Sequence, residues 1–546
     1  MNSRQLPWQL SSVAISSLIL FPLLTLLWLS FSGTQELWAH LSSTVLSDYV
    51  LGSLQLMFGV AILTLLLGIG SAWLVTQYRF VGSGFFNWAL LLPLAMPSYI
   101  TAYSYTGLLD VAGPVQSTIR STLGLSFNDY WFPEIRSMGG AIFVISFVLY
   151  PYVYMLARAS FTDQSKSLSD AGQLLGLSRR QSFFRITLPI ARPAVIAGLS
   201  LALMETLADY GTVSYFSVST FTTGIFRTWY GLDSVQTAAQ LSLMLLMFVI
   251  VLLTVEKSSR KKALYHDKSR GRAALPKQLA GSKQLVAVIL ASTPLLLGFI
   301  IPVSQLVFWA IQTHAQLFEA SFWVLIRNTL MLASITALLA LVLALILAYA
   351  HRIVGKPITR IALQIGQLGY AVPGTVIAVG TLIPLARLDN QIDAWFRVNF
   401  DISTGLLISG SIGALLIAYL VRFLAVSLNA IDSSLSSIAQ SMDHTARSLG
   451  LSPLQILRRV HIPMLKTGLF TGLLVVFVDV MKELPATLIL RPFNFNTLAV
   501  RAYELASDER LADASLASLA IVLVGLVPVI LLSRGITSGQ KPSNQI

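Results

Sequence analysis

The sequence contains no cysteine, and charged residues make up only 11% of its 546 positions. The absence of cysteine excludes disulfides, thiolate metal ligands and iron–sulfur clusters for this chain. A Gly-x4-Gly-Lys-Ser/Thr phosphate loop is also missing, because the one Gly-Lys pair, at Gly355 and Lys356, is followed by Pro357. No His-Glu-x-x-His spacing and no serine nucleophile elbow occurs. We therefore expect no catalytic residue and no cofactor bound by this chain.

Apolar residues dominate instead: they form 55% of the chain, and the mean hydropathy is +0.73. A soluble domain cannot hide that much hydrocarbon from water. Apolar runs of about 20 residues, the length that a bilayer core requires, recur along the whole chain. We expect about twelve spans, at 12–31, 50–77, 85–109, 138–158, 191–209, 236–255, 285–311, 323–350, 361–385, 405–428, 464–481 and 514–533. The predicted class is an all-α polytopic membrane protein, with the first run retained as a helix rather than cleaved as a secretory signal.

The net charge of +13 is spread unevenly. With a cytoplasmic N-terminus and alternating runs, most Lys and Arg residues fall on cytoplasmic segments, which is the positive-inside bias. This pattern predicts a membrane protein with both termini cytoplasmic and no nucleic-acid partner. Residues 256–283 hold nine basic and two acidic residues. We interpret them as a solvated cytoplasmic linker, with specific lipid or nucleic-acid binding as the alternative.

The linker separates two copies of one pattern. Residues 170–189 read DAGQLLGLSRRQSFFRITLP, and residues 444–463 read HTARSLGLSPLQILRRVHIP, at a constant offset of 274. This predicts a first repeat over 1–255 and a second over 284–546. An even number of about six spans per repeat gives both the same orientation, with a pseudo-twofold axis along the membrane normal.

Each repeated segment, 163–189 and 437–463, is too polar to cross a membrane and is expected to lie in the cytoplasm. In the second copy, apolar residues alternate with basic ones in the manner of short amphipathic helices. Gly176 and Gly450 permit a sharp bend between two such helices. Pro189 and Pro463 then begin the next span, where a missing N–H costs little.

These two segments resemble the EAA loop of ABC-importer permeases, and the resemblance covers nearly the whole chain. It implies the type I permease fold, a location in the bacterial inner membrane, and a coupling helix that docks on a cytoplasmic ATPase. Two ATPase copies, which carry the ATP and Mg, would each hold one loop. The residues at the matching positions are Asp170, Ala171, Gly172, Gly176 and Pro189 in the first loop, and His444, Thr445, Ala446, Gly450 and Pro463 in the second. Neither loop has the glutamate of the motif.

Two carboxylates lie four residues apart at the end of the fifth span of each half. They are Glu205 and Asp209 in the first half, and Asp479 and Glu483 in the second. The spacing puts each pair on one helical face, and we expect the four to attract cations to one vestibule. Lys482 is also expected on the substrate pathway. The alternative is local pairing at the external interface, for instance of Lys482 with Asp479. These residues by themselves indicate only a small polar or cationic solute.

The segments 482–487, 491–499 and 503–511 resemble the ferric-iron subgroup of fused permeases. That resemblance implies transport of Fe(III), delivered by a periplasmic or lipoprotein binding protein and passing transiently between the four carboxylates. It also implies that the stretch from Arg491 to Arg510 is an external docking loop, with Glu504, Asp508 and Glu509 on its rim. Thiamine and small organophosphorus importers share this layout and remain alternatives. A secondary transporter without an ATPase is a more distant one.

Overall fold

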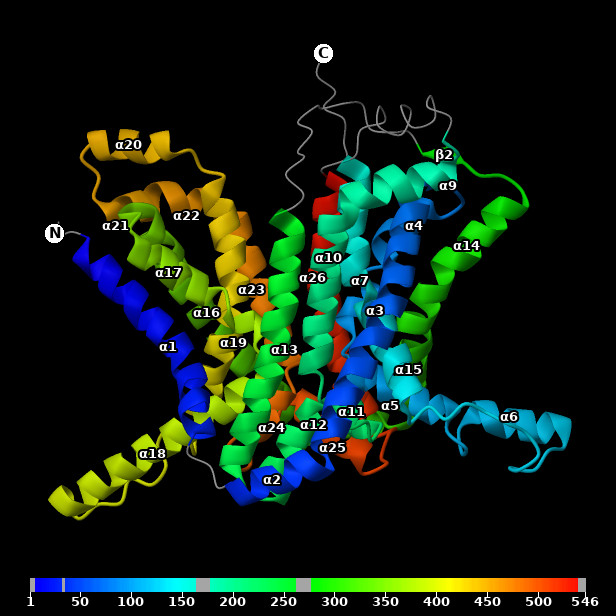
Figure 1. The fold of residues 1–546 in the computed structure, drawn as a ribbon, viewed down its shortest axis with the longest axis horizontal. Coiled ribbons are helices and arrows are strands. Elements are labelled where there is room, and N and C mark those ends of the chain that lie inside the picture. Colours follow the sequence, from blue (N-terminus) through cyan, green and yellow to red (C-terminus); the bar gives the residue numbers. More distant parts are fainter. Residues whose placement is uncertain (1–4, 32–34, 164–176, 262–275, 539–546) are drawn as a thin grey trace. The chain divides into compact units, whose positions relative to one another are not determined.

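The computed structural model describes residues 5–31, 35–163, 177–261 and 276–538, and nearly all of their regular structure is helical (Figure 1). In the first half of the chain the elements are α1 (Leu6–Ser30), α2 (Gln35–Thr44), α3 (Leu46–Gln77), β1 (Tyr78–Arg79), α4 (Ser83–Ala89), η1 (Leu92–Ala95), α5 (Ser98–Leu109), α6 (Pro114–Leu123), α7 (Met138–Asp163), α9 (Arg179–Ser182), η2 (Phe183–Thr187), α10 (Leu188–Ala208), α11 (Gly211–Tyr215), α12 (Phe221–Phe226), η3 (Arg227–Gly231) and α13 (Val235–Lys261).

In the second half they are β2 (Lys277–Gln278), α14 (Ser282–Leu295), η4 (Leu296–Ile300), α15 (Ile301–Gln312), η5 (His314–Phe318), α16 (Ala320–Val354), α17 (Pro357–Gly366), η6 (Gly369–Ala371), α18 (Gly374–Phe400), α19 (Ile412–Ser436), α20 (Gln440–Ser448), α21 (Pro453–Ile456), η7 (Leu457–His461), α22 (Ile462–Met464), α23 (Lys466–Met481), α24 (Pro485–Leu490), α25 (Leu498–Ser507) and α26 (Ser515–Ser538). The two strands are only two residues long and pair in parallel, so the predicted all-α class is confirmed.

Among the described residues, eight helices are long and apolar enough to cross a bilayer by themselves. They are Leu6–Ser30, Leu46–Gln77, Met138–Thr162, Phe183–Ala208, Val235–Ser259, Ser282–Gln312, Ala320–Val354 and Ile412–Ser436. Three bent pairs reach the same length only together, namely Ser83–Ala95 with Ser98–Leu123, Pro357–Ala371 with Gly374–Phe400, and Pro453–Met464 with Lys466–Met481. With the shorter apolar stretch Ser515–Leu531, these elements account for every run expected from the sequence.

Two of the expected runs, 85–109 and 361–385, are broken rather than continuous, which corrects the sequence-based prediction. The bends are 92° and 113°. Each break falls at a proline, Pro97 or Pro373, whose preceding residue is extended, with ψ of 120° at Met96 and 125° at Val372. Proline has no N–H to continue a helix and disfavours helical angles in the residue before it.

The helices cluster into two compact units that cross the sequence halves. The second-half unit comprises the chain up to Leu41, Gly224–Leu246 and Ala315–Arg501. In it, α1 packs against α16, α17 and α18. The first-half unit comprises Ser42–Thr223, Met247–His314 and the chain from Ala502 onward. In it, α15 packs against α5 and α26. The leading helix of each sequence half thus belongs to the unit built mainly from the other half. The boundaries at 255 and 284 stay a prediction about the repeats.

Small residues let the helices of each unit approach closely, as is common where lipid supplies no hydrophobic drive between helices. In the first-half unit, a Cβ on Gly198 of α10 would lie 2.7 Å from the carbonyl oxygen of Tyr152 in α7. In the second-half unit, α16 contacts α19 and α23. Along α16 runs a stripe of fully buried alanines, Ala333, Ala337, Ala340, Ala344 and Ala348.

Gly369, in η6 just before the break at Pro373, offers a test of this close packing. A Cβ there would lie 1.8 Å from the backbone oxygen of Val421, which cannot move aside. We expect Gly369→Ala to lower the free energy of unfolding by about 1–3 kcal/mol or more, as overpacking does, in thermal unfolding of the detergent-solubilised protein. Gly70→Ala in α3 is the control, because nothing lies within 4 Å of its Cβ position. Equal melting temperatures for the two variants would contradict the close approach.

Candidate functional site

In each half a helix is broken at a proline near the end of the fifth span, which is α10 in the first half and α23 in the second. We call each of these breaks a corner. The corner of the first-half unit joins η1 to α5, and that of the second-half unit joins η6 to α18. The signal in the sequence is a repeat that sequence reasoning missed, Ala-Met-Pro at 95–97 and Ala-Val-Pro at 371–373. Its offset is 276 rather than 274. The residues that follow the two prolines, Ser98 and Gly374, occupy matching positions and differ in chemistry.

Asp209, which follows α10, connects the first corner to α11. Its carboxylate accepts hydrogen bonds from the Ser98 hydroxyl, from the Thr212 N–H and hydroxyl, both at 2.9 Å, and from the Val213 N–H at 3.3 Å. Two of these donors are N–H groups of the first turn of α11, which have no partner within that helix. The predicted site residue Asp209 therefore caps a helix and closes a corner. Glu205 lies one turn earlier and is half-buried.

Glu483 has the same position in the second-half unit but a different partner. Its carboxylate lies 3.1 Å from the Arg422 guanidinium, and it accepts a 3.1 Å hydrogen bond from the Ala486 N–H in the first turn of α24. Both charged side chains are less than one-tenth exposed. A Cβ on Gly374 would lie 2.3 Å from the Arg422 Nη1 atom and 2.5 Å from the Glu483 Oε1 atom. Glycine at this position makes room for the ion pair.

Arg422 is a site residue that the sequence analysis overlooked. It is the single charged residue in the apolar run 405–428. A charge within a span is costly unless it has a partner, so it marks a functional or structural contact. That signal, applied to Arg422, would have predicted a buried carboxylate opposite it.

Asp479 is bonded locally, as the alternative interpretation of the acidic pattern expects. Its carboxylate lies 2.9 Å from the Lys482 ammonium. Asp479 and Glu483 are thus matched by Lys482 and Arg422, and the four formal charges cancel. The described residues include no group of three or more His, Asp or Glu side chains placed to hold a metal ion. Transient passage of Fe(III) between the four carboxylates remains a prediction.

We call the two repeated segments, 163–189 and 437–463, the first and second coupling segments. The second forms the pair of short helices, α20 and α21, that its sequence predicts. Gly450 follows α20 with φ of +81°, and the Leu451 N–H bonds to the Ala446 carbonyl across the bend. Ser452 and Gln455 form a capping box at the start of α21. The bend at Gly450 is therefore confirmed, since left-handed backbone angles favour glycine.

The other predicted coupling residues are distributed as follows. His444 and Thr445 are exposed on α20, whereas Ala446 is buried. Pro463 lies in α22, and the span itself begins three residues later, at Lys466, after a 78° bend. In the first loop, Pro189 is in the first turn of α10 as expected. The remaining predicted residues of that loop, Asp170, Ala171, Gly172 and Gly176, lie outside the described residues.

A buried polar network holds α20 in place. The Asp443 carboxylate accepts a 2.7 Å hydrogen bond from the Arg352 Nε, at the end of α16, and lies 2.6 Å from the His461 Nε2. Arg352 also donates to the carbonyls of Leu435 at 2.5 Å and Ile438 at 2.9 Å. Burial raises the pKa of Asp443, but its hydrogen bonds outweigh that effect and hold the pKa below its usual value. The long span α16 is thereby connected to the coupling segment.

Several apolar side chains on this segment face solvent. Met442, Leu449 and Leu454 are exposed, Leu449 by 77%. A helix pair that is fixed by a buried ion pair and presents apolar side chains to water has the properties of a docking surface.

The residues expected to form an external docking loop are more ordered than predicted. Residues Leu498–Ser507 form the helix α25, because Leu498, Ala502 and Leu505, at the spacing i, i+4 and i+7, bury one apolar face of it. The expectation of a loop throughout 491–510 is therefore wrong for this part. Thr497 immediately precedes the helix and caps it, because its hydroxyl accepts a hydrogen bond from the Val500 N–H.

The charged residues of this stretch are partly bonded within the protein. Arg491 donates to the Asn496 side chain, and Arg510 pairs with Asp513 at 2.7 Å. Glu509 accepts two hydrogen bonds from Arg136, at 2.7 and 2.8 Å, which lower the pKa of its carboxyl. Arg136, just before α7, is a residue that sequence reasoning missed. Glu504 is half-buried, and Asp508 is exposed.

Two segments of the chain match one family model. The model, described as a binding-protein-dependent transport system inner membrane component, matches residues 64–259 and 340–538. The chain belongs to this permease family. Each matched segment contains one coupling segment and one acidic pair, so the internal duplication of the permease is confirmed.

Individual permeases resemble this one to different extents. The Fe(3+)-transport system permease protein FbpB 2 of Haemophilus influenzae is 28% identical over 495 residues, which is 90% of each chain. The molybdenum transport system permease protein ModB of the same organism is 30% identical over 172 residues, 31% of this chain and 72% of its own length. A probable sulfate transport system permease protein of Chlorella vulgaris is 28% identical over 174 residues, 31% of this chain and 61% of its own.

The ion pair between Arg422 and Glu483 yields a prediction for this permease. Glu483→Gln keeps an acceptor for Ala486 but leaves the buried guanidinium without a counter-charge, which costs roughly 3–5 kcal/mol. We expect a lower melting temperature for the single variant and recovery of most of the loss in Arg422→Gln/Glu483→Gln. The exposed Asp508→Asn is the control. If the single and double variants have the same melting temperature, the ion pair between Arg422 and Glu483 does not stabilise the fold as inferred.

The network around Asp443 yields a second prediction. Asp443→Asn removes the charge between Arg352 and His461. The free energy needed to unfold α20 locally should then fall by roughly 3–5 kcal/mol. Backbone amides of residues 440–448 should then exchange with deuterium more than about 100-fold faster. His444→Gln, at the exposed neighbouring position, should leave exchange unchanged. Similar exchange in both variants would show that the network does not hold α20.

Proposed function

We propose that this chain is the membrane permease of an ATP-driven importer that moves ferric iron into a bacterial cell. The observation that carries the substrate is the extent of similarity. The relative named for Fe(3+) transport aligns with 90% of the chain, through both halves, whereas the relatives named for molybdenum and sulfate align with 31% to 39% of it. The protein lies in the inner membrane, with both termini in the cytoplasm.

The energy comes from two copies of a separate ATPase subunit, one on each coupling segment. The exposed Met442, Leu449 and Leu454 of the second segment support this arrangement, because they offer an apolar surface on a held helix pair. ATP and Mg bind to the ATPase. Closure of the ATPase pair pulls the coupling segments together and shifts the spans between inward-open and outward-open forms.

An extracytoplasmic binding protein delivers the iron. Arg491, Glu504 and Asp508 are the docking residues, while Glu509 and Arg510, already bonded to Arg136 and Asp513, shape the surface around them. Glu205 then attracts the cation along the pathway, because it does not cap a helix as Asp209 and Glu483 do, whereas Lys482 offsets the charge of Asp479.

An oxyanion is the second candidate substrate. Arg422 and Lys482 cancel the charges of Glu483 and Asp479, so this end of the second-half unit has no net attraction for a cation. The relatives named for sulfate and molybdenum favour the same candidate over thiamine or an organophosphorus compound.

One uptake experiment separates these possibilities. Cells that express the permease with its ATPase and binding protein are given labelled ferric iron, molybdate or sulfate, with and without depletion of ATP. We expect ATP-dependent iron uptake that falls roughly tenfold in Glu205→Gln/Asp479→Asn, which corresponds to about 1.4 kcal/mol of lost attraction. Glu134→Gln/Asp401→Asn removes two exposed carboxylates outside both the acidic pairs and the docking stretch, and it should leave the uptake rate unchanged.

Co-purification of the ATPase reports assembly in every variant. Preferred uptake of molybdate or sulfate would overturn the iron assignment and leave the importer class standing. A wild-type protein that co-purifies with no ATPase and transports after ATP depletion would overturn the importer class. Normal iron uptake by Glu205→Gln/Asp479→Asn would show that these carboxylates do not guide the cation.

A further inference from the structure

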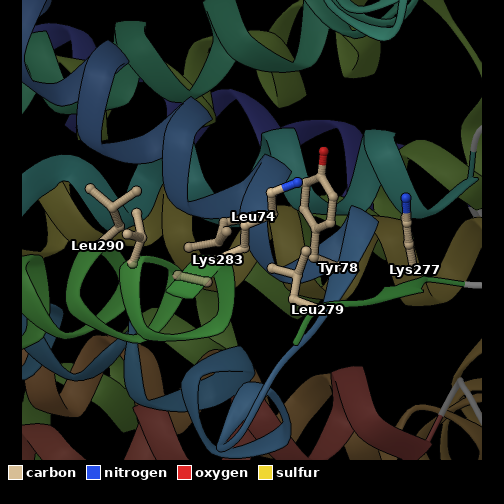
Figure 2. A pocket seen from close by; sticks show the side chains of 8 residues that line it. Leu74, Tyr78, Lys277, Leu279, Lys283 and Leu290 are labelled. Atoms are coloured by element: carbon tan, nitrogen blue, oxygen red, sulfur yellow. The ribbon is translucent and has the colours of Figure 1, made fainter. Parts of the chain in front are cut away.

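An open groove lies between the end of α3 and the start of α14 in the first-half unit. Its volume is about 250 Å³. The strand pair β1–β2 forms its rim, with Tyr78 opposite Lys277 and a 2.8 Å hydrogen bond from the Leu279 N–H to the Arg79 carbonyl. Figure 2 shows the side chains that line it, which are Leu74, Tyr78, Lys277, Leu279, Lys283, Val286, Ala287 and Leu290.

The groove has a cationic end and an apolar end. Lys277 and Lys283 are exposed, Tyr78 adds a hydroxyl, and none of the lining residues is acidic. Val286 and Leu290 are more than half exposed. Leu290 lies seven residues after Lys283 on α14, about 10 Å along the helix axis. In Figure 2, Lys277 and Leu290 lie at opposite ends of the lining.

Both helices that form the groove are membrane spans, and the groove lies where they end. Leu46–Gln77 ends one residue before Tyr78, and Ser282–Gln312 begins one residue before Lys283. The cationic end is therefore at the level of lipid headgroups, and the exposed face of α14 continues into the hydrocarbon. A ligand for such a groove combines an anionic phosphate with an acyl chain.

We propose that this groove binds an anionic glycerophospholipid. Its phosphate lies between Lys277 and Lys283, within reach of the Tyr78 hydroxyl, and one acyl chain runs along Val286 and Leu290. Lysines close to a membrane surface are attracted to anionic lipids. The described end of the basic segment 256–283 is thus a lipid site joined to β1, rather than only a solvated linker.

The test uses the full-length protein in a mild detergent, titrated with phosphatidylglycerol or with phosphatidylcholine, with bound lipid counted by native mass spectrometry. We expect phosphatidylglycerol to bind preferentially, and Lys277→Gln/Lys283→Gln to weaken its binding roughly 30-fold, about fivefold for each lysine. Lys257→Gln/Lys356→Gln, which removes two exposed lysines at other helix ends, should bind as the wild type does.

Two further measurements identify the source of the phosphate. Leu290→Ser alters an exposed side chain that a soluble phosphate would not touch, and it should weaken phosphatidylglycerol binding severalfold. Glycerol 3-phosphate at millimolar concentration should not displace the lipid. Equal binding of both lipids, or unchanged binding in Lys277→Gln/Lys283→Gln, would overturn the proposal. Displacement by glycerol 3-phosphate together with no effect of Leu290→Ser would replace the lipid with a soluble phosphate compound. If the double-lysine variant does not fold, Leu290→Ser decides the outcome.

Discussion

A helix that breaks inside a bilayer frees N–H and carbonyl groups that no water can satisfy, so protein groups must bond them. Both halves of this permease contain such a break, at Pro97 and Pro373. In both, a carboxylate at the end of the fifth span lies beside the corner and caps the short helix that follows the carboxylate along the chain, Asp209 for α11 and Glu483 for α24. Acids that look like a substrate site in the sequence therefore also have a structural task.

The two corners have diverged in how they meet this constraint. Where the first has the hydroxyl of Ser98 beside Asp209, the second has Gly374, and the guanidinium of Arg422 occupies the space that glycine leaves. A hydroxyl brings no charge to the carboxylate, whereas a guanidinium brings a counter-charge. The duplication thus preserves geometry and not electrostatics.

The second coupling segment shows how a soluble-looking loop is joined to the membrane helices. Asp443 bonds to Arg352 at the end of α16 and to His461 of η7, while Tyr349 on α16 donates to the Pro453 carbonyl at 2.6 Å. A displacement of α20 would therefore be transmitted to a 35-residue span through bonded and packed groups. The network is buried, so its removal is costly, and this supports movement of the segment with its span.

The amino-acid sequence by itself determined the class, the positions of the spans and the duplication, because each is a matter of apolar length or repeated spacing along the chain. It also determined the bend at Gly450, which depends on one residue's backbone freedom. The tertiary structure decided which charges meet. Arg422 with Glu483, Arg352 with Asp443 and Arg136 with Glu509 join residues 61, 91 and 373 positions apart. No local pattern encodes such a pairing, since it arises only when separate helices pack. The same reason explains why the expected external loop contains the helix α25, whose apolar face required a packing partner elsewhere in the chain.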